Sequence, residues 1–412
     1  MRLATAFLLT TLSLAAQSPT DQTIRRLDGS HIGSSAASAL AERILKENKV
    51  TGAEIAVLND GHLVWISGFG LRDKQNNLPM TPVTTTWAAS ITKGVFAVYV
   101  MTLVEQHRLD LDRPIVQLLD KPLDSYPDYK QTAGDLVRDQ RWSAVTPRML
   151  LSHTSGLANF ASLEPDKKMH LHYAPGSRFA YSGEGLNLLQ FVIEQREHKP
   201  LEELMQKAIF TPLEMRYTSM VWNEVLASNV ADRYDANSNF ISHTRRDHAR
   251  AAGSMTTAAT DLARLAAALT NDGRKAQGPV GSDSTLSIVH ASSLETLFTP
   301  AIRIDTKHQF PTFDETKSSE GPSVGLAYGL GWGLLTKTKY GPAFFKEGHG
   351  DGAQNYMICF TKHRDCMIIL TNSDNGELAF KPLLEGVLGD TVTPWEWEGY
   401  TREGILASRQ HQ

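Results

Sequence analysis

Cysteine is scarce in this sequence, with only Cys359 and Cys366 among 412 residues. Neither belongs to a sequence signature of the kind that, with His and Asn or Asp, marks a thiol nucleophile, which argues against cysteine-based catalysis. The residues Lys362 to Asp365 between them are predicted to form a hairpin turn that pairs Thr361 with Cys366. The two cysteines are then not directly opposite each other, and the pattern leaves open whether they form a disulfide.

A concentrated charge of either sign is also absent. Lys and Arg number 41 and Asp and Glu number 45, giving a formal net charge of −4, and both signs are scattered along the chain. No basic cluster of the kind that marks a nucleic-acid binder occurs. We therefore expect a small-molecule or peptide substrate as the partner, and no nucleic acid.

Long apolar runs are missing except near the start of the chain. Leu3 to Leu14 follows Met-Arg and precedes Ala15-Ala16-Gln17-Ser18, which is the order of a secretory signal peptide. The run is shorter than the roughly 20 residues of a spanning helix, and no Cys follows it for lipid attachment. We expect residues 1–16 to be a signal peptide and the mature protein, without a membrane span, to be periplasmic or secreted. An uncleaved N-terminal anchor is the alternative.

Strand patterns occur toward both ends of the chain, with helical patterns between them. The expected strands are 52–58, 62–69, 330–336, 343–347, 354–361 and 366–372. Helical periodicity marks 35–48, 89–106, 185–196, 201–209, 261–271 and 377–388. The polar residues 17–34 are predicted to be a flexible mature N-terminus, and 389–412 an irregular, loosely packed tail.

This order of elements predicts the fold class, α/β plus an all-α lobe. Strands near both ends imply one domain, 35–388, with an antiparallel sheet formed by the N- and C-terminal segments and flanked by helices. The mostly helical stretch of about 107–275 then forms a lobe inserted between them.

The Ser90-Ile-Thr-Lys93 stretch is the first candidate for catalysis. A Ser at the start of a helix lies near free backbone N–H groups, and a Lys three residues later lies one turn on along the same face. A buried Lys can lose its proton near neutral pH and act as a base. An ordinary helix-capping Ser beside a surface Lys is the other interpretation of this motif alone.

Further motifs follow in a fixed order. They are Leu150-Leu-Ser-His-Thr-Ser-Gly-Leu157, Pro175-Gly-Ser-Arg-Phe-Ala-Tyr-Ser182, Gly253-Ser-Met-Thr-Thr257 and Gly348-His-Gly-Asp-Gly352. With these motifs the chain, from about 38 to 388, resembles the class C β-lactamase-related family of serine hydrolases, which includes penicillin-binding peptidases and some esterases. The resemblance implies a serine β-lactamase/DD-peptidase-like fold.

The resemblance also implies roles for individual residues. Ser90 would be the acylated nucleophile and Lys93 its base. Tyr181 would relay the proton to the leaving group and help to activate water. His349 would be the cation that replaces the first Lys of the family's Lys-Thr-Gly element. The N–H groups of Ser90 and Gly352 would form the oxyanion hole.

The sequence departs from the family pattern at two positions. Gly183 stands where relatives commonly have the Asn that binds the substrate's acylamino group, and Asp351 stands where the third position is commonly Gly. Asp351 would either crowd the strand edge or lie in a bulge that lets Gly352 take the role. These departures weaken the prediction of the substrate more than that of the chemistry. Short esters, D-amino-acid peptides and β-lactams all stay open as substrates.

Two other classes of function compete with an acyl-enzyme hydrolase. A non-catalytic relative could bind peptides or cell wall with the same fold. His170-Leu-His172 could suggest zinc, but no further ligands follow at close spacing, so we expect neither a metal nor an organic cofactor. No Gly-x-Ser-x-Gly occurs, which argues against the α/β-hydrolase route to serine chemistry.

Overall fold

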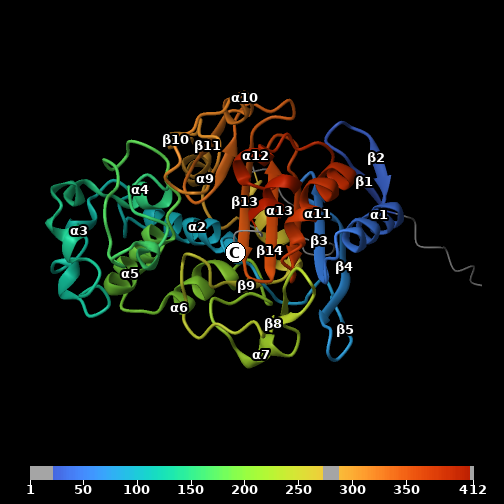
Figure 1. Cartoon of the computed structure of the whole chain (residues 1–412), viewed down its shortest axis with the longest axis horizontal. Coiled ribbons are helices and arrows are strands. Elements are labelled where there is room, and N and C mark those ends of the chain that lie inside the picture. The colour runs from blue at the N-terminus through green and yellow to red at the C-terminus, as the bar shows by residue number, and fades with distance from the viewer. Residues whose placement is uncertain (1–21, 272–286, 409–412) are drawn as a thin grey trace, which may run out of the picture.

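The computed structural model describes residues 22–271 and 287–408 and contains one large antiparallel sheet (Figure 1). Its nine strands run in the order β10-β11-β12-β13-β14-β15-β3-β4-β5. Their bounds are β3 Gly52–Asn59, β4 His62–Asp73, β5 Leu78–Pro79, β10 Ile302–Arg303, β11 Leu326–Tyr328, β12 Gly333–Leu335, β13 Ala343–Gly350, β14 Ala353–Phe360 and β15 Asp365–Thr371. Because β15 pairs with β3, the two ends of the chain build one sheet, as predicted.

The hairpin between β3 and β4 has the turn that its sequence favours. Asp60 and Gly61 both have positive φ, at 52° and 79°, the combination that a two-residue turn of type I′ requires. Asn59 then pairs with His62. All eight residues of β3 are buried, because helices cover both faces of the sheet in its middle.

The hairpin between β14 and β15 differs in register from the prediction. Phe360 pairs with Asp365, so the connection is 361–364 and the turn begins one residue earlier than expected. Cys359 therefore lies directly opposite Cys366, and the two form a disulfide with Cα atoms 4.1 Å apart. The shift arises where the left-handed Arg364, at φ 53°, closes the loop.

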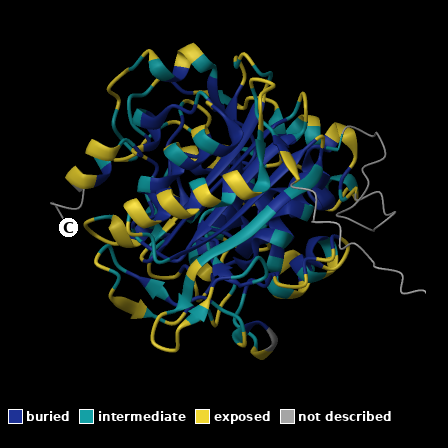
Figure 2. Ribbon diagram, turned by 90° about the vertical axis from the view of Figure 1, so that its right-hand side faces the viewer, coloured by how far each residue is buried: buried dark blue, intermediate teal, exposed yellow. Residues whose placement is uncertain are grey.

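Two hydrophobic cores lie on the two faces of the sheet. On one face, α2 Ile91–Glu105 is apolar on all sides and almost wholly buried, so it runs between the sheet and the helical lobe. On the other face, α1 Ser34–Glu47 and α11 Gly376–Leu383 pack against the sheet. Figure 2 shows the result, with the strands of the sheet buried and exposed residues gathered on the outer helices and turns.

The lobe inserted between the two halves of the sheet is mostly helical, as expected, and extends from the left of Figure 1, at α3, to below the sheet, at α7. Its α-helices are α3 Gly134–Arg138, α4 Pro147–Leu151, α5 Gly183–Glu197, α6 Leu201–Met205, α7 Glu224–Ala227 and α8 Ala259–Leu269. Three short strands interrupt the helices, namely β7 Arg233–Tyr234, β8 Phe240–Ser242 and β9 Thr256–Thr257. The last of these pairs with β6 Thr86–Trp87, shortly before Ser90, and so connects the lobe to the segment that carries Ser90.

The predictions for the chain ends need correction where the structure describes them. Residues 1–16 lie outside the described residues, but β1 Thr23–Arg25 and β2 His31–Gly33 form a hairpin in the segment expected to be flexible. The expected loose tail contains α12 Trp395–Glu398 and α13 Arg402–Ser408, and its Trp397 is 1% exposed. Both segments add apolar side chains to the second core. The prediction missed this because it relied on the polar residues around those side chains. Within the described residues, none of the helices combines the length and apolarity needed to cross a membrane.

Candidate active site

Ser90 lies at the first turn of α2, where the chain leaves β6. The residue before it, Ala89, has a left-handed backbone with φ 46°, a conformation that costs energy for a residue with a Cβ. The Ser90 hydroxyl makes no hydrogen bond that caps the helix. It accepts a hydrogen bond from Lys93 Nζ at 2.8 Å instead, so the capping interpretation of this motif does not hold.

Lys93 is a buried amine rather than a surface lysine. Its side chain is 1% exposed, and Nζ also donates to the Ala252 carbonyl oxygen at 2.5 Å. Burial lowers the pKa of Lys93 well below its ordinary value, the positive charge of Lys346 lowers it further, and Glu347 opposes the shift. Lys93 is thus placed and electrostatically prepared to take the proton of Ser90.

Tyr181 reaches the same cavity from the start of α5. Its ring centroid lies 4.9 Å from Lys93 Nζ, and its hydroxyl interacts with Ser90. Burial raises the pKa of Tyr181, and Lys346 opposes the rise. The phenol therefore keeps its proton at neutral pH and can donate it. The structure brings Ser90, Lys93 and Tyr181 together, as the family resemblance implies.

The cation next to Tyr181 is Lys346, which differs from the prediction that His349 takes this place. Lys346 Nζ donates to the Tyr181 hydroxyl at 3.2 Å and to Glu347 Oε1 at 2.5 Å, with no part of the side chain exposed. Burial acts to lower the pKa of Lys346, but Glu347 and Tyr181 outweigh it and the pKa is raised. Lys346-Glu347-Gly348 reads as Lys-x-Gly in the sequence, a signal that the prediction of His349 overlooked.

His349 lies near the far end of the same strand, β13, and Gly352 follows it in the turn. The His349 side chain is 60% exposed at the cavity wall, and Nδ1 is 2.6 Å from Glu377 Oε1. Gly352 lies in the two-residue turn after β13, and its N–H donates to Asp374 Oδ1 at 2.5 Å. With that N–H already bonded, the structure does not place Gly352 as an oxyanion donor. The β13–β14 register also runs on to Gly350, so the strand has no bulge before Asp351.

A buried histidine, His153, packs against the ring of Tyr181. His153 has a left-handed backbone and no exposed surface, and its ring lies 4.3 Å from the Tyr181 ring. Its Nδ1 accepts the Ser182 N–H at 3.1 Å. Burial lowers the pKa of His153 well below its ordinary value, and Lys93 and Lys346 lower it further. His153 is therefore neutral and fixes the position of the segment that carries Tyr181.

Gly183, the position at which the family resemblance predicts an Asn, has no room for a side chain. A Cβ there would lie 2.5 Å from the Phe160 ring. The Gly183 N–H donates to the side-chain oxygen of Asn159 at 2.9 Å, and Asn159 itself lines the cavity together with Asn187. Amide side chains thus reach the site from positions that the motifs did not predict.

Ser90, Lys93, Tyr181 and His349 line one cavity of about 790 Å³. Besides these four residues, its wall contains Trp87, Asn159, Arg246, Arg250, Phe310, Glu347, Glu377, Glu398 and Tyr400. This volume suits a molecule the size of a short peptide or a drug. Both lobes and the C-terminal segment contribute to the wall, so the substrate space exists only in the folded chain.

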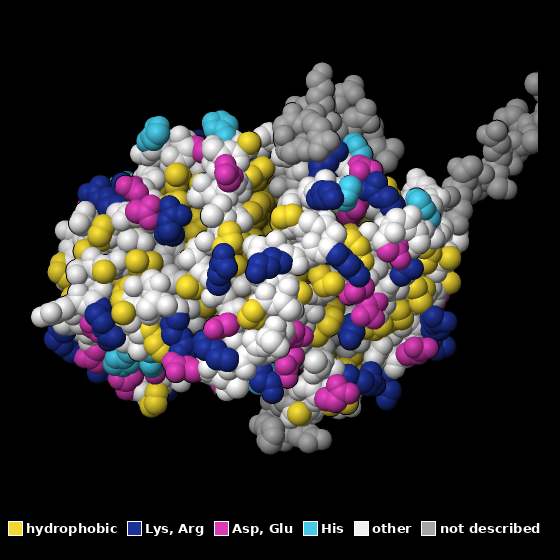
Figure 3. Space-filling view, turned by 90° about the horizontal axis from the view of Figure 1, so that it is seen from above, with side chains coloured by type: hydrophobic (Ala, Val, Ile, Leu, Met, Phe, Trp, Pro, Cys, Tyr) yellow, Lys and Arg dark blue, Asp and Glu magenta, His cyan; other side chains and the backbone are white. Residues whose placement is uncertain are grey.

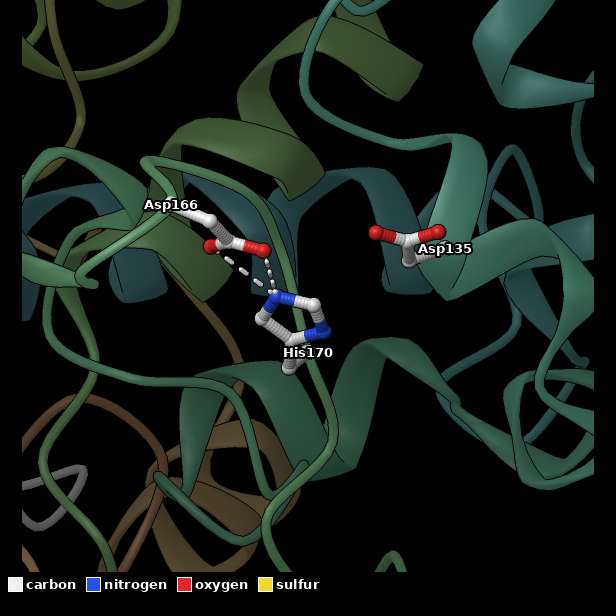
Figure 4. A group of neighbouring side chains, drawn as sticks. All are labelled: Asp135, Asp166 and His170. Atoms are coloured by element: carbon white, nitrogen blue, oxygen red, sulfur yellow. Dashed lines mark hydrogen bonds and ion pairs between the residues drawn. The ribbon is translucent and has the colours of Figure 1, made fainter.

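A group of potential metal ligands lies apart from this cavity. Asp135, Asp166 and His170 bring one ligand atom each within 4.8 Å of one another (Figure 4). Asp166 already pairs with His170 Nε2 at 2.9 Å, and Asp135 with Lys168 at 3.1 Å. These side chains are not buried, and a positive Lys beside Asp135 opposes a cation, so we assign no metal to them.

Comparison with known proteins places this geometry in a family. The Beta-lactamase family model matches residues 37–386, which is most of the chain. This chain belongs to the Beta-lactamase family. Among curated members, Esterase EstB of Burkholderia gladioli is 28% identical over 238 residues, covering 52% of this chain and 53% of the esterase.

Other relatives in the family match shorter stretches. The mitochondrial serine beta-lactamase-like protein LACTB of Bos taurus is 34% identical over 121 residues, or 29% of this chain and 20% of LACTB. A D-aminopeptidase of Brucella canis is 24% identical over 190 residues, or 44% and 35% of the two chains. The matched regions therefore span about half of the esterase and less of the others.

Solved structures of the family share the fold. A penicillin-binding protein homologue from Pyrococcus abyssi superposes with a TM-score of 0.66 at 22% identity, covering 87% of this chain and 79% of that one. The D-alanine carboxypeptidase AmpC from Burkholderia cenocepacia gives 0.63 at 17% identity, covering 85% and 99%. The antiparallel sheet with flanking helices is thus an architecture that this chain shares with these solved structures.

Proposed function

We propose that this protein is an exported serine hydrolase that forms an acyl-enzyme on Ser90. The observation that carries the proposal is the 2.8 Å contact between Lys93 Nζ and Ser90 Oγ, with Lys93 fully buried. A lysine in such surroundings holds its proton weakly and can accept one from the hydroxyl. The reacting carbonyl belongs to an ester, an amide or a β-lactam.

The residues support a two-step reaction. Lys93 takes the Ser90 proton as Oγ attacks the carbonyl carbon, and the carbonyl oxygen becomes an oxyanion. When the tetrahedral intermediate collapses, the bond to the leaving group breaks, and the proton passes from Lys93 through the Tyr181 phenol to that group. In the second step, Lys93 and Tyr181 take a proton from water as it attacks the acyl carbon. The bond between that carbon and Oγ then breaks, the acid leaves, and the proton returns to Ser90 Oγ. Lys346 remains charged throughout and favours negative charge on Tyr181.

The β13 backbone supports His349, rather than Gly352, as the second oxyanion donor. Gly350 and Ala353 flank a two-residue turn and therefore form a hydrogen-bonded pair. Hydrogen-bonded and non-hydrogen-bonded pairs alternate along an antiparallel ladder, so the next pair, His349 and Gln354, is not hydrogen-bonded. The His349 N–H therefore points away from β14. No strand of the described sheet pairs with His349 on that side, since the pairing of β13 with β12 extends only from Ala343 to Phe345. A Cβ on Gly348 would lie 2.3 Å from the Ala88 carbonyl oxygen, so this part of β13 lies against the residues before Ser90.

Export is supported by two features of the chain. The first residues have the order of a secretory leader. The only two cysteines are paired, and disulfides persist mainly in oxidising compartments such as the periplasm or the cell exterior. We propose a periplasmic or secreted location for the mature enzyme.

Covalent labelling tests the proposal directly. The protein would be incubated with a fluorescent penicillin and a fluorophosphonate, and the adduct located by mass spectrometry of peptides. We expect label on Ser90, its loss in Ser90→Ala, and its retention in the exposed control Ser323→Ala. Label from neither probe, combined with no turnover of p-nitrophenyl esters, nitrocefin or D-Ala-D-Ala peptides, would favour the non-catalytic binding relative instead.

A further inference from the structure

Phe310 is a large apolar residue that stays accessible beside the catalytic groups. It lies in the loop between β10 and α10 Glu320–Val324 and is 47% exposed. Single apolar side chains are normal on a protein surface, and on the molecular face in Figure 3 they are interspersed with charged ones. Of the exposed large apolar residues that the structure describes, however, Phe310 alone lines the cavity around Ser90.

The ring of Phe310 packs against the ring of Tyr181. The two ring centroids are 5.3 Å apart and the ring planes are inclined at 66°, which is the edge-to-face arrangement that aromatic pairs favour. Tyr181 is almost wholly buried, whereas Phe310 is not. Phe310 therefore covers part of the phenol and leaves apolar surface accessible next to it.

The residue before Phe310 anchors this part of the loop. Gln309 is 3% exposed, and its backbone N–H donates to the Trp397 carbonyl oxygen at 2.8 Å. Its side-chain Nε2 donates to Glu347 Oε1 at 3.3 Å. The exposed ring is thus carried by a backbone that is fixed to the C-terminal segment and to β13.

The loop is also held at its base and on its other side. The Lys307 N–H donates to the Thr316 carbonyl oxygen at 2.6 Å, which closes the base. The Phe313 ring lies 4.1 Å from the ring of His172 in the helical lobe. Because these contacts already order the loop, a ligand that packs on Phe310 loses little affinity to ordering it. An accessible apolar ring in a preformed cavity is a typical recognition element.

The contact with Tyr181 indicates which part of the substrate reaches Phe310. In the proposed reaction, the Tyr181 phenol passes a proton to the leaving group, so the leaving atom lies within hydrogen-bond distance of the phenol oxygen. The acyl carbon is held at Ser90 Oγ. An apolar group attached to the leaving atom is therefore the part of the substrate that lies nearest to Phe310.

We propose that Phe310 selects substrates whose leaving group is large and apolar, such as an aromatic alcohol. This inference rests on the proposed function and names the leaving-group class of its substrate. Burial of the leaving group against the ring supplies binding energy, and the same contact holds the leaving atom at Tyr181. As the acyl C–O bond breaks, the Ser90 proton passes through Lys93 and Tyr181 to the alcohol oxygen, and the neutral alcohol departs.

Two isomeric esters test the proposal. Benzyl acetate has its ring on the leaving alcohol, methyl phenylacetate has the same ring on the acyl side, and methyl acetate is the reference without a ring. With the wild type, we expect kcat/KM for benzyl acetate to exceed that for methyl acetate by about tenfold or more. In Phe310→Ala this ratio should fall close to one, while the ratio of methyl phenylacetate to methyl acetate should stay as in the wild type.

Ratios between substrates remove effects of the substitution that are common to all of them. Benzyl acetate and methyl acetate also form the same acetyl-enzyme on Ser90, so a difference between them arises before the alcohol leaves. Phe310→Leu keeps an apolar side chain and should retain most of the preference. The matched control is Leu163→Ala, at a residue that is 69% exposed and does not line the cavity. Its ratios should equal those of the wild type.

The outcomes separate this inference from the function on which it rests. An unchanged benzyl preference in Phe310→Ala, or a loss confined to methyl phenylacetate, overturns the inference and leaves the hydrolase intact if Ser90 is still labelled. Failure of every probe to acylate Ser90 overturns the hydrolase and the inference with it. If Ser90 is labelled but no ester is hydrolysed, the protection of Ser90 from the fluorophosphonate by each ester gives its affinity, and the same ratios decide.

Discussion

At the scale of single residues, two buried lysines face one phenol but hold their protons differently. Of the carboxylates that the structure describes, none pairs with Lys93, which donates to neutral oxygens, whereas Lys346 is paired with Glu347. The pKa is accordingly lowered for Lys93 and raised for Lys346. One amine can therefore act as the base while the other remains a fixed positive charge.

This arrangement predicts the pH dependence of catalysis. Since Lys93 acts as a base only when neutral, kcat/KM should rise with pH through its lowered pKa. Replacing Lys346 by Met removes a positive neighbour and leaves Glu347 unpaired, and both changes favour protonated Lys93. The rising limb of the kcat/KM profile should therefore move to higher pH, by about one unit or more.

The matched control is Lys339→Met, which removes an exposed lysine that pairs with Asp390 far from the site. Its profile should coincide with that of the wild type. A limb that stays in place in Lys346→Met, or moves to lower pH, would show that Lys346 does not set the pKa of the base.

At the scale of elements, residues 346–349 of β13 make three separate contributions to the candidate site. The strand carries Lys346 beside Tyr181, turns the His349 N–H to its free edge and approaches the nucleophile segment at Gly348. The last contact depends on the absence of a side chain, because the neighbouring atom is a backbone oxygen that cannot rotate away. The strand can thus reach the Ser90 segment only with Gly at 348.

Gly348→Ala is therefore expected to force β13 away from Ala88. We predict that catalytic efficiency falls by roughly 100-fold or more, the effect of losing one oxyanion donor, together with lower thermal stability. The control is Gly134→Ala, where the nearest atom to a new Cβ is the end of the Arg138 side chain at 3.5 Å. The test measures kcat/KM and the melting temperature of both variants. A fully active Gly348→Ala would contradict the close approach of Gly348 to the Ala88 carbonyl oxygen.

At the scale of the whole molecule, the C-terminal segment forms part of the wall of the cavity around Ser90. Trp395, Trp397 and Tyr400 pack into the second core, and the same segment supplies Glu398 to the cavity wall. Trp397 contacts the rings of Phe179 and Phe345, so it links the segment before Tyr181 to β13. Stability and substrate space are therefore coupled through this segment.

Trp397→Ala should consequently destabilise the fold and impair catalysis together. We expect the free energy of unfolding in urea to fall by about 3–5 kcal/mol, the usual cost of truncating a buried large aromatic side chain. Trp222→Ala, at a half-buried position beside Arg245, should cost about 1 kcal/mol or less. Equal stability losses in the two variants would argue against a structural role for the C-terminal segment.

Much of the architecture and the central chemistry follows from the sequence alone. Strand and helix periodicity, which depends on local alternation, predicted the principal elements of both halves of the sheet. The Ser-x-x-Lys spacing placed Lys93 beside Ser90, since three residues on a helix bring two side chains to one face. The family motifs added Tyr181 because they carry information that periodicity does not.

Tertiary structure alone decided the features that depend on contacts between distant segments. The one-residue shift at the β14–β15 turn placed Cys359 opposite Cys366, and a local turn pattern does not specify that register. The β13 register brought Lys346 rather than His349 to Tyr181. Burial of the C-terminal segment turned an expected tail into a cavity wall, because a short apolar stretch gains its stability only from the core that receives it.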